Sequence, residues 1–245
     1  MPRTISTSAS DHRIRVAPIA GTVFAAAGLA HSFPALAGAW PALRAPLGIE
    51  QCTLDGTGCA LTFDDGPHRS GTPAVLDVLE REQVTATFFM VGEQVRKSPA
   101  LAREVAERGH RIALHCDRHR NLLRLAAPQV REDLARAADR IFGATDRPIG
   151  LYRPPYGIST GASLILSRSR GWRTLLWTHW GKDWQASASA ASIAALATSH
   201  LRPGSVVLLH DADDYGTPGS WRKSADALPA IIDAVRAAGL QFSQA

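Results

Sequence analysis

The chain has 245 residues, a length typical of one α/β domain, and an apolar fraction of 45% that is ordinary for a globular protein. Its formal charge of +5 comes mostly from arginines scattered along the chain, without a concentrated basic stripe or a known nucleic-acid-binding module. These features argue against a nucleic-acid partner, and one hydrophobic core is enough for a chain of this size.

The first fifty residues combine a basic start with an apolar run. Arg3, Arg13 and Arg15 precede an Ala/Gly/Val-rich stretch from Val16 to about Trp40, which contains the small-residue sequence ALAGA. Signal peptides and membrane anchors have this pattern, so we expect a secreted or cell-envelope-associated protein. A histidine and a proline interrupt the run, however. The alternative is a cytoplasmic protein in which this segment packs against the folded domain.

We therefore divide the chain into an N-terminal segment, 1–50, and a folded domain, 51–245. Near the start of the domain, Cys52 and Cys59 flank a short glycine-containing segment across which a disulfide is sterically possible. Export would favour that bond, and two unpaired thiols are the alternative. No CxxC pair or Cys/His cluster accompanies them, so a structural metal site is not predicted here.

From Ala60 onward, short β-like runs alternate with helix-length segments. The expected strands are Cys59–Phe63, Thr87–Val91, Arg111–His115, Leu151–Arg153, Thr174–Trp177 and Ser205–His210, with a weak last strand at Leu240–Phe242. The expected helices are Pro73–Glu82, Pro99–Arg108, Pro128–Phe142, Gly161–Arg170, Ser189–His200 and Ser224–Ala238. Most of the strands are apolar throughout, as buried parallel strands are. About seven β/α units predict either a barrel or a doubly wound open sheet.

Polar residues gather at the C-terminal ends of these strands, where β/α folds build their active sites. They are Asp64, Asp65, His115, Arg153, Asp183 and His210. On a regular strand the consecutive carboxylates of Asp64 and Asp65 would point to opposite faces. A turn at Gly66–Pro67 lets both face one centre, so that one can bind a metal ion while the other acts as a base. A pair of turn or capping carboxylates is the alternative.

For most of the other residues in this set, the sequence allows both a functional and a purely structural interpretation. His115 and His119 are four residues apart, which places two imidazoles on one side of a helical turn or tight loop. With one carboxylate they form a suitable catalytic zinc set; two exposed histidines in an Arg-rich loop are the alternative. Arg153 lies in YRPPYG, where the prolines stiffen the backbone beside it. His210 ends an apolar run, as a buried core histidine also could, and Asp183 could cap a helix.

Taken together and in this order, these residues resemble the polysaccharide deacetylase family, carbohydrate esterase family four, which includes chitin, peptidoglycan and Nod-factor precursor deacetylases. The similarity extends from about Ala60 to the C-terminus and depends on TFDDGP at 62–67, RPPYG at 153–157 and LLHD at 208–211. It implies an α/β fold, a distorted (β/α) barrel of about seven parallel strands with outer helices. It also implies that 51–245 is a catalytic domain.

By this resemblance, Asp64 is the general base, and Asp65, His115 and His119 hold a divalent metal ion. We expect Zn²⁺, with Co²⁺, Mn²⁺ or Ni²⁺ as alternatives. Availability matters as much as affinity, so ligand type alone does not fix the metal.

The resemblance gives the remaining polar residues supporting roles. Arg153 orients the base, and Tyr156 lends its backbone N–H to the oxyanion. His210 is the general acid, and Asp183 holds it and tunes its acidity.

The pocket for the acetyl methyl group is formed, by resemblance, by Trp184 and Leu208. Two positions depart from the family pattern. Cys116 follows the first metal-binding histidine where Ser or Thr is usual, and Trp180 replaces an Asp of the DW motif. The first change alters the surroundings of the ligands, and the second alters the loop that contacts the sugar.

The expected reaction is metal-dependent hydrolysis of N-acetyl groups on a polysaccharide or oligosaccharide that contains N-acetylglucosamine, by a monomer that associates with no nucleic acid. Two alternatives stay open: a deacetylase or esterase for another acylated substrate, such as acetylxylan or a small metabolite, and a catalytically idle wall-binding protein. The loop from Ala212 to Lys223 carries further candidate sugar contacts, namely Asp213, Asp214, Tyr215 and Trp221.

Overall fold

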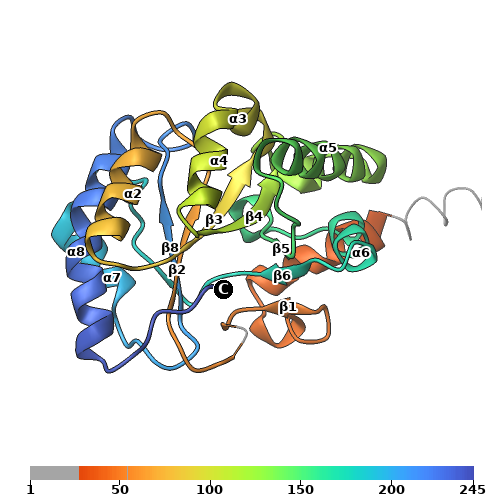
Figure 1. Cartoon of the computed structure of the whole chain (residues 1–245). Helices are drawn as coiled ribbons and strands as arrows, with labels where there is room; N and C mark the ends of the chain where they lie inside the picture. Colours follow the sequence, from red (N-terminus) through yellow and green to blue (C-terminus); the bar gives the residue numbers. More distant parts are fainter. Residues whose placement is uncertain (1–27, 54) are drawn as a thin grey trace, which may run out of the picture.

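The computed structural model describes residues 28–53 and 55–245, which form a curled parallel sheet covered by helices (Figure 1). Its eight strands lie in the order β1-β6-β5-β4-β3-β2-β8-β7. All neighbouring strands are parallel, and β1 and β7 form the two edges. The strands are β1 (Ile49–Glu50), β2 (Ala60–Asp64), β3 (Thr87–Val91), β4 (Arg111–Cys116), β5 (Leu151–Tyr152), β6 (Arg173–Leu175), β7 (His179–Trp180) and β8 (Val206–His210). The predicted distorted barrel is confirmed, in an open form.

The strand count differs from the expected seven. β1 and β7 were not predicted, because each has only two residues, one of which is polar, Glu50 or His179, so neither forms an apolar run in the sequence. The weak strand expected at Leu240–Phe242 is wrong, because only Phe242 pairs, through an isolated bridge to Cys59.

Helices follow most strands. They are α2 (Gly71–Arg81), α3 (Gly92–Lys97), α4 (Pro99–Glu107), α5 (Ala127–Thr145), α6 (Gly161–Ser169), α7 (Ala190–Ala197) and α8 (Ser220–Ala237), with short 3₁₀ turns η1 (Phe33–Gly38), η2 (Pro41–Leu43), η3 (Leu122–Arg124) and η4 (Pro155–Gly157). The short helix α3 was not predicted, and α8 begins four residues before Ser224. α4 begins at Pro99, as its missing N–H allows.

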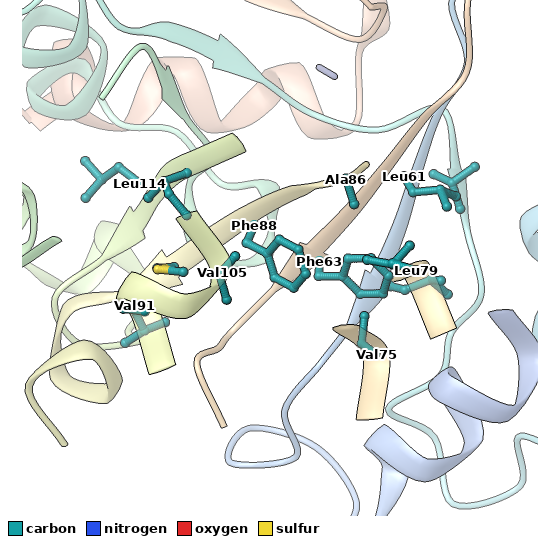
Figure 2. Packing of buried hydrophobic residues seen from close by; sticks show 14 of the residues in the cluster. Leu61, Phe63, Val75, Leu79, Ala86, Phe88, Val91, Val105 and Leu114 are labelled. Carbon is teal, nitrogen blue, oxygen red and sulfur yellow. The ribbon is translucent and has the colours of Figure 1, made fainter. Parts of the chain in front are cut away.

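The core lies between the sheet and the outer helices. Phe63 of β2 and Phe88 of β3 are register partners, and their rings stack with centroids 5.1 Å apart. Figure 2 shows this pair beside Val75 and Leu79 of α2 and Val105 of α4. Because side chains alternate along a strand, burying Phe63 against the helices turns Asp64 to the inner side of the curl.

Part of the N-terminal segment packs on the domain. Ala37 and Ile49 form a small buried cluster with Leu164 of α6 and Leu176, and β1 pairs with β6 across the boundary predicted at residue 50. Residues 1–27, which carry most of the signal-like sequence, lie outside the described residues. No helix in the described part of the chain is both long and apolar enough to cross a bilayer.

The disulfide considered between Cys52 and Cys59 is not formed. Both are free thiols, and Cys59 is buried where β2 begins while Cys52 is exposed. The Cys59 backbone also pairs with Phe242, so this cysteine is fixed in the core at the start of β2.

Candidate active site

The C-terminal ends of the strands surround a cavity of about 260 Å³. It is lined by Asp64, Asp65, His115, His119, Tyr156, Trp184, Leu208 and His210, together with Trp177, Trp180, Ala212, Tyr215 and Gly216. Arg153 and Asp183 do not line the cavity but lie directly behind it, both fully buried. The structure therefore brings all ten predicted site residues to one place.

The two adjacent carboxylates reach the same cavity because the chain turns between them. Asp64 ends β2, and Asp65 takes a left-handed backbone conformation with φ of 80°, which breaks the alternation of the strand. Gly66 follows against the buried carboxylate of Asp211: a Cβ atom at Gly66 would lie 2.3 Å from an Asp211 oxygen. Only glycine fits there without displacing Asp211.

Asp65, His115 and His119 form a compact group of potential metal ligands, with one ligand atom from each within 4.8 Å of the others. Asp65 Oδ1 lies 3.5 Å from Nε2 of His115 and 3.5 Å from Nε2 of His119. His115 is on β4, and its Nδ1 is 2.7 Å from the backbone oxygen of Arg153. Nδ1 therefore donates to that oxygen, which leaves the Nε2 lone pair facing Asp65.

The surroundings of this group fit a cation. Asp65 Oδ1 is buried and has no hydrogen-bond partner among the described residues, so a cation would satisfy it. Burial raises the pKa of Asp65 to about 7 and lowers the pKa values of His115 and His119 to about 3. Neutral imidazoles are the form that binds metal.

Asp64 is paired with a buried arginine. Arg153 Nη1 donates to Asp64 Oδ1 at 2.7 Å and to Thr62 Oγ1 at 2.8 Å, and its guanidinium lies 3.9 Å from the centre of the Phe89 ring. Burial raises the pKa of Asp64, and the positive charge of Arg153 counteracts that shift. This pair holds the Asp64 carboxylate in a fixed orientation at the cavity, with a positive charge beside it that favours the ionised form.

His210 faces the same cavity from the end of β8. Its Nδ1 lies 2.8 Å from Asp183 Oδ1, and its Nε2 lies 3.9 Å from Asp65 Oδ2. Burial alone would lower the pKa of His210, but the negative charge and hydrogen bond of Asp183 raise it to about 10. Asp183 is thus no simple helix cap, because it favours the protonated form of His210.

Aromatic side chains form the rest of the wall. Trp184 meets His210 edge-on with ring centroids 5.4 Å apart, and Trp180 lies 5.3 Å from Trp184 and 5.8 Å from Trp177. Sequence analysis missed Trp177, because it is the last residue of the expected strand Thr174–Trp177 and has the pattern of a core residue. Trp180, which stands where the family's DW motif has an Asp, is 39% exposed.

Of the four candidate sugar contacts in the loop after β8, only Tyr215 lines the cavity. Its ring stacks on His119 with centroids 4.4 Å apart. Asp213 instead pairs with His68, with 3.3 Å between Asp213 Oδ1 and His68 Nε2. Neither Asp214 nor Trp221 lines the cavity. Nothing in the loop sequence distinguishes Tyr215 from its neighbours.

Comparisons with known proteins agree with this geometry. A family model described as polysaccharide deacetylase matches residues 53–175. A chitooligosaccharide deacetylase of Bradyrhizobium sp. (strain ANU 289) is 37% identical over 168 residues, which cover 68% of this chain and 75% of that protein. A peptidoglycan-N-acetylglucosamine deacetylase of Bacillus cereus is 33% identical, over 75% of this chain and 65% of that protein.

A solved structure shows the same fold. The crystal structure of a peptidoglycan N-acetylglucosamine deacetylase superposes with a TM-score of 0.73 and 29% identity, covering 80% of this chain and 89% of that one. The resemblance drawn from the sequence is thereby confirmed: the chain belongs to the polysaccharide deacetylase family.

Proposed function

We propose that this polysaccharide deacetylase removes N-acetyl groups from glycans that contain N-acetylglucosamine, of the chitooligosaccharide or peptidoglycan kind, with the help of a divalent metal ion. One observation carries the proposal. The buried ligand group of Asp65, His115 and His119 lies within 4.0 Å of a carboxylate, Asp64, and of an imidazolium, His210. A base, an acid and a metal site thus share one cavity, and metal-assisted amide hydrolysis uses this combination.

Asp65, His115 and His119 would hold the metal ion. One carboxylate and two imidazoles match the ligand preference of Zn²⁺ and leave room for a substrate oxygen; Co²⁺, Mn²⁺ and Ni²⁺ are also compatible with this set. When bound, such an ion acts as a Lewis acid toward the acetyl carbonyl and toward water.

Asp64 and His210 divide the proton transfers. Asp64, kept ionised by Arg153, accepts a proton from the water that attacks the acetyl carbonyl. His210, kept protonated by Asp183, gives a proton to the amine nitrogen as the C–N bond breaks. Each step contributes about 10²- to 10⁴-fold to the rate. The Tyr156 backbone N–H helps to hold the oxyanion that forms when the water attacks, before the C–N bond breaks.

The cavity walls support an acetylated sugar as the substrate. Trp184 and Leu208 provide apolar surface for the acetyl methyl group, and Trp180 with Tyr156, 60% exposed, provides aromatic faces for the pyranose ring. Secretion or association with the cell envelope would bring the enzyme to such polymers.

The test is acetate release from N-acetylated chitooligosaccharides, peptidoglycan and acetylxylan. It is run before and after treatment with a chelator, and again after adding back Zn²⁺ or Co²⁺, with Asp64→Asn as the inactive control. We expect metal-restored release from an N-acetylated glycan. Release from acetylxylan alone would instead support an esterase, and no release by a protein that binds metal would indicate another acyl substrate or an idle binder.

A further inference from the structure

A second cleft adjoins the active-site cavity. His119 and Tyr156 line both, and their rings meet edge-on with centroids 4.6 Å apart. The cleft has a volume of about 660 Å³, and its other polar side chains are Arg120, Asn121 and Arg124. None of its lining residues is acidic, and none is a tryptophan. A glycan that places one sugar in the cavity can therefore extend past Tyr156 into basic surroundings.

The Arg120 side chain is held in place by a buried carboxylate, that of Asp133. Nη2 of Arg120 donates to Oδ1 of Asp133 at 2.5 Å, and the Asp133 side chain is 2% exposed. The other carboxylate oxygen, Oδ2, accepts the backbone N–H of Asp117 at 2.8 Å. A buried carboxylate thus fixes one nitrogen of the guanidinium. Its remaining N–H groups have no partner in the described residues, and less side-chain freedom is lost when they bind a ligand.

Arg124 adds an uncompensated charge. It ends the turn η3, is exposed, and makes no ion pair with any residue that the structure describes. Asn121 uses its side-chain oxygen to accept the Leu123 backbone N–H at 3.0 Å, so its amide N–H groups remain as donors. Since Asp133 balances Arg120, the cleft has one net positive charge and several N–H donors, which match a singly charged carboxylate.

We propose that this cleft binds a carboxylate on the sugar next to the one that loses its acetyl group, so that an acidic N-acetylated glycan is preferred over a neutral one. The inference rests on the proposed function and narrows its substrate class. The formal charge of +5 acts in the same direction, because it favours approach of an anionic polymer.

The experiment compares two tetrasaccharides, a neutral one of N-acetylglucosamine and one in which carboxylate-bearing N-acetylated sugars alternate with N-acetylglucosamine. For each, Kd is measured by titration calorimetry, and KM by acetate release from the metal-loaded enzyme. The variant is Arg124→Gln. The matched control is Arg118→Gln, which removes the same charge from an exposed residue of the same loop that does not line the cleft.

We expect the wild-type enzyme to bind the acidic tetrasaccharide more tightly than the neutral one. Arg124→Gln should reduce that preference about three- to tenfold, the size expected for the net contribution of one hydrogen bond in a solvent-exposed cleft. Arg118→Gln should keep the wild-type preference. Salt at 0.5 M should also weaken the preference, because the cleft is open to solvent.

Two results would overturn the inference: equal wild-type affinity for the two glycans, or an equal loss of preference in Arg118→Gln and Arg124→Gln. A failure of the proposed function would be seen as a different result from a failure of this inference. If neither glycan released acetate but Arg124→Gln still weakened binding of the acidic one, the carboxylate site in the cleft would be supported and the deacetylase activity would be rejected.

Discussion

Asp183 holds His210 through both of its carboxylate oxygens. Oδ1 lies 2.8 Å from His210 Nδ1, and Oδ2 accepts the backbone N–H of the same histidine at 2.7 Å. The Ser224 hydroxyl of α8 donates to Oδ2 at 2.6 Å. Nδ1 is thereby committed to the carboxylate, so the proton available to a substrate is the one on Nε2, which faces the cavity.

This arrangement predicts how the pH profile responds to Asp183→Asn. The charge of Asp183 favours the imidazolium, and removing it lowers the pKa of His210 from its value of about 10. In each enzyme, activity that depends on a protonated His210 is lost as the pH rises through the pKa of His210 in that enzyme. The alkaline limb of kcat/KM should therefore move to lower pH, as measured by acetate release from pH 5 to a pH above the wild-type limb.

The control for that profile is Asp226→Asn, which changes an exposed acid on α8 and should leave the limb in place. An alkaline limb that Asp183→Asn does not move would mean that another group, and not His210, supplies the proton.

The metal group predicts a second result. His115→Ala removes a buried ligand, so metal content and acetate release should be lost together. Metal content is measured by atomic emission after dialysis, and His200→Ala, at an exposed position outside the cavity, is the matched control. A His115→Ala enzyme with full metal content and full activity would show that the ligand assignment is wrong.

The neighbouring carboxylates should separate chemistry from metal binding. Asp64→Asn removes the base but no ligand, so kcat should fall about 10²- to 10⁴-fold while metal stays bound. Asp65→Asn weakens a ligand, so metal and activity should fall together. Each variant serves as the control for the other, because both replace one buried carboxylate with an amide. Equal metal loss in the two would contradict the division of roles.

Much of the fold could be predicted from local pattern. β3 was predicted residue for residue over Thr87–Val91, because a short apolar run bounded by polar residues is typical of a buried parallel strand. The location of several site residues followed from the same pattern, since a polar residue at the end of such a strand lies at the C-terminal edge of the sheet. Asp64 and His210, which are register partners on β2 and β8, are the clearest cases. Tyr156, Trp184 and Leu208 were found only through the family resemblance.

The remaining features depend on tertiary contacts. β1 and β7 exist because two residues of each pair with a longer or better-anchored neighbour, and two residues carry no periodicity. Spacing allowed a bond between Cys52 and Cys59, but the burial of Cys59 is fixed by β2 and by Phe242. The Arg120–Asp133 pair spans thirteen residues and two elements, so sequence analysis found only an Arg-rich loop.

The aromatic wall gives the last prediction. Trp180 is on the edge strand β7, is partly exposed, and lies between Trp177 and Trp184. Trp180→Ala should raise KM for an N-acetylated tetrasaccharide about two- to tenfold, as expected for the loss of one aromatic contact. An aryl acetate too small to reach the wall should be hydrolysed with little change in KM. Trp40→Ala, which removes a tryptophan that is 60% exposed and outside the cavity, controls for loss of surface aromatic area. If Trp180→Ala slowed hydrolysis of both substrates equally, the residue would be supporting the catalytic groups themselves, through Trp184 and His210, and would not be a contact for the sugar.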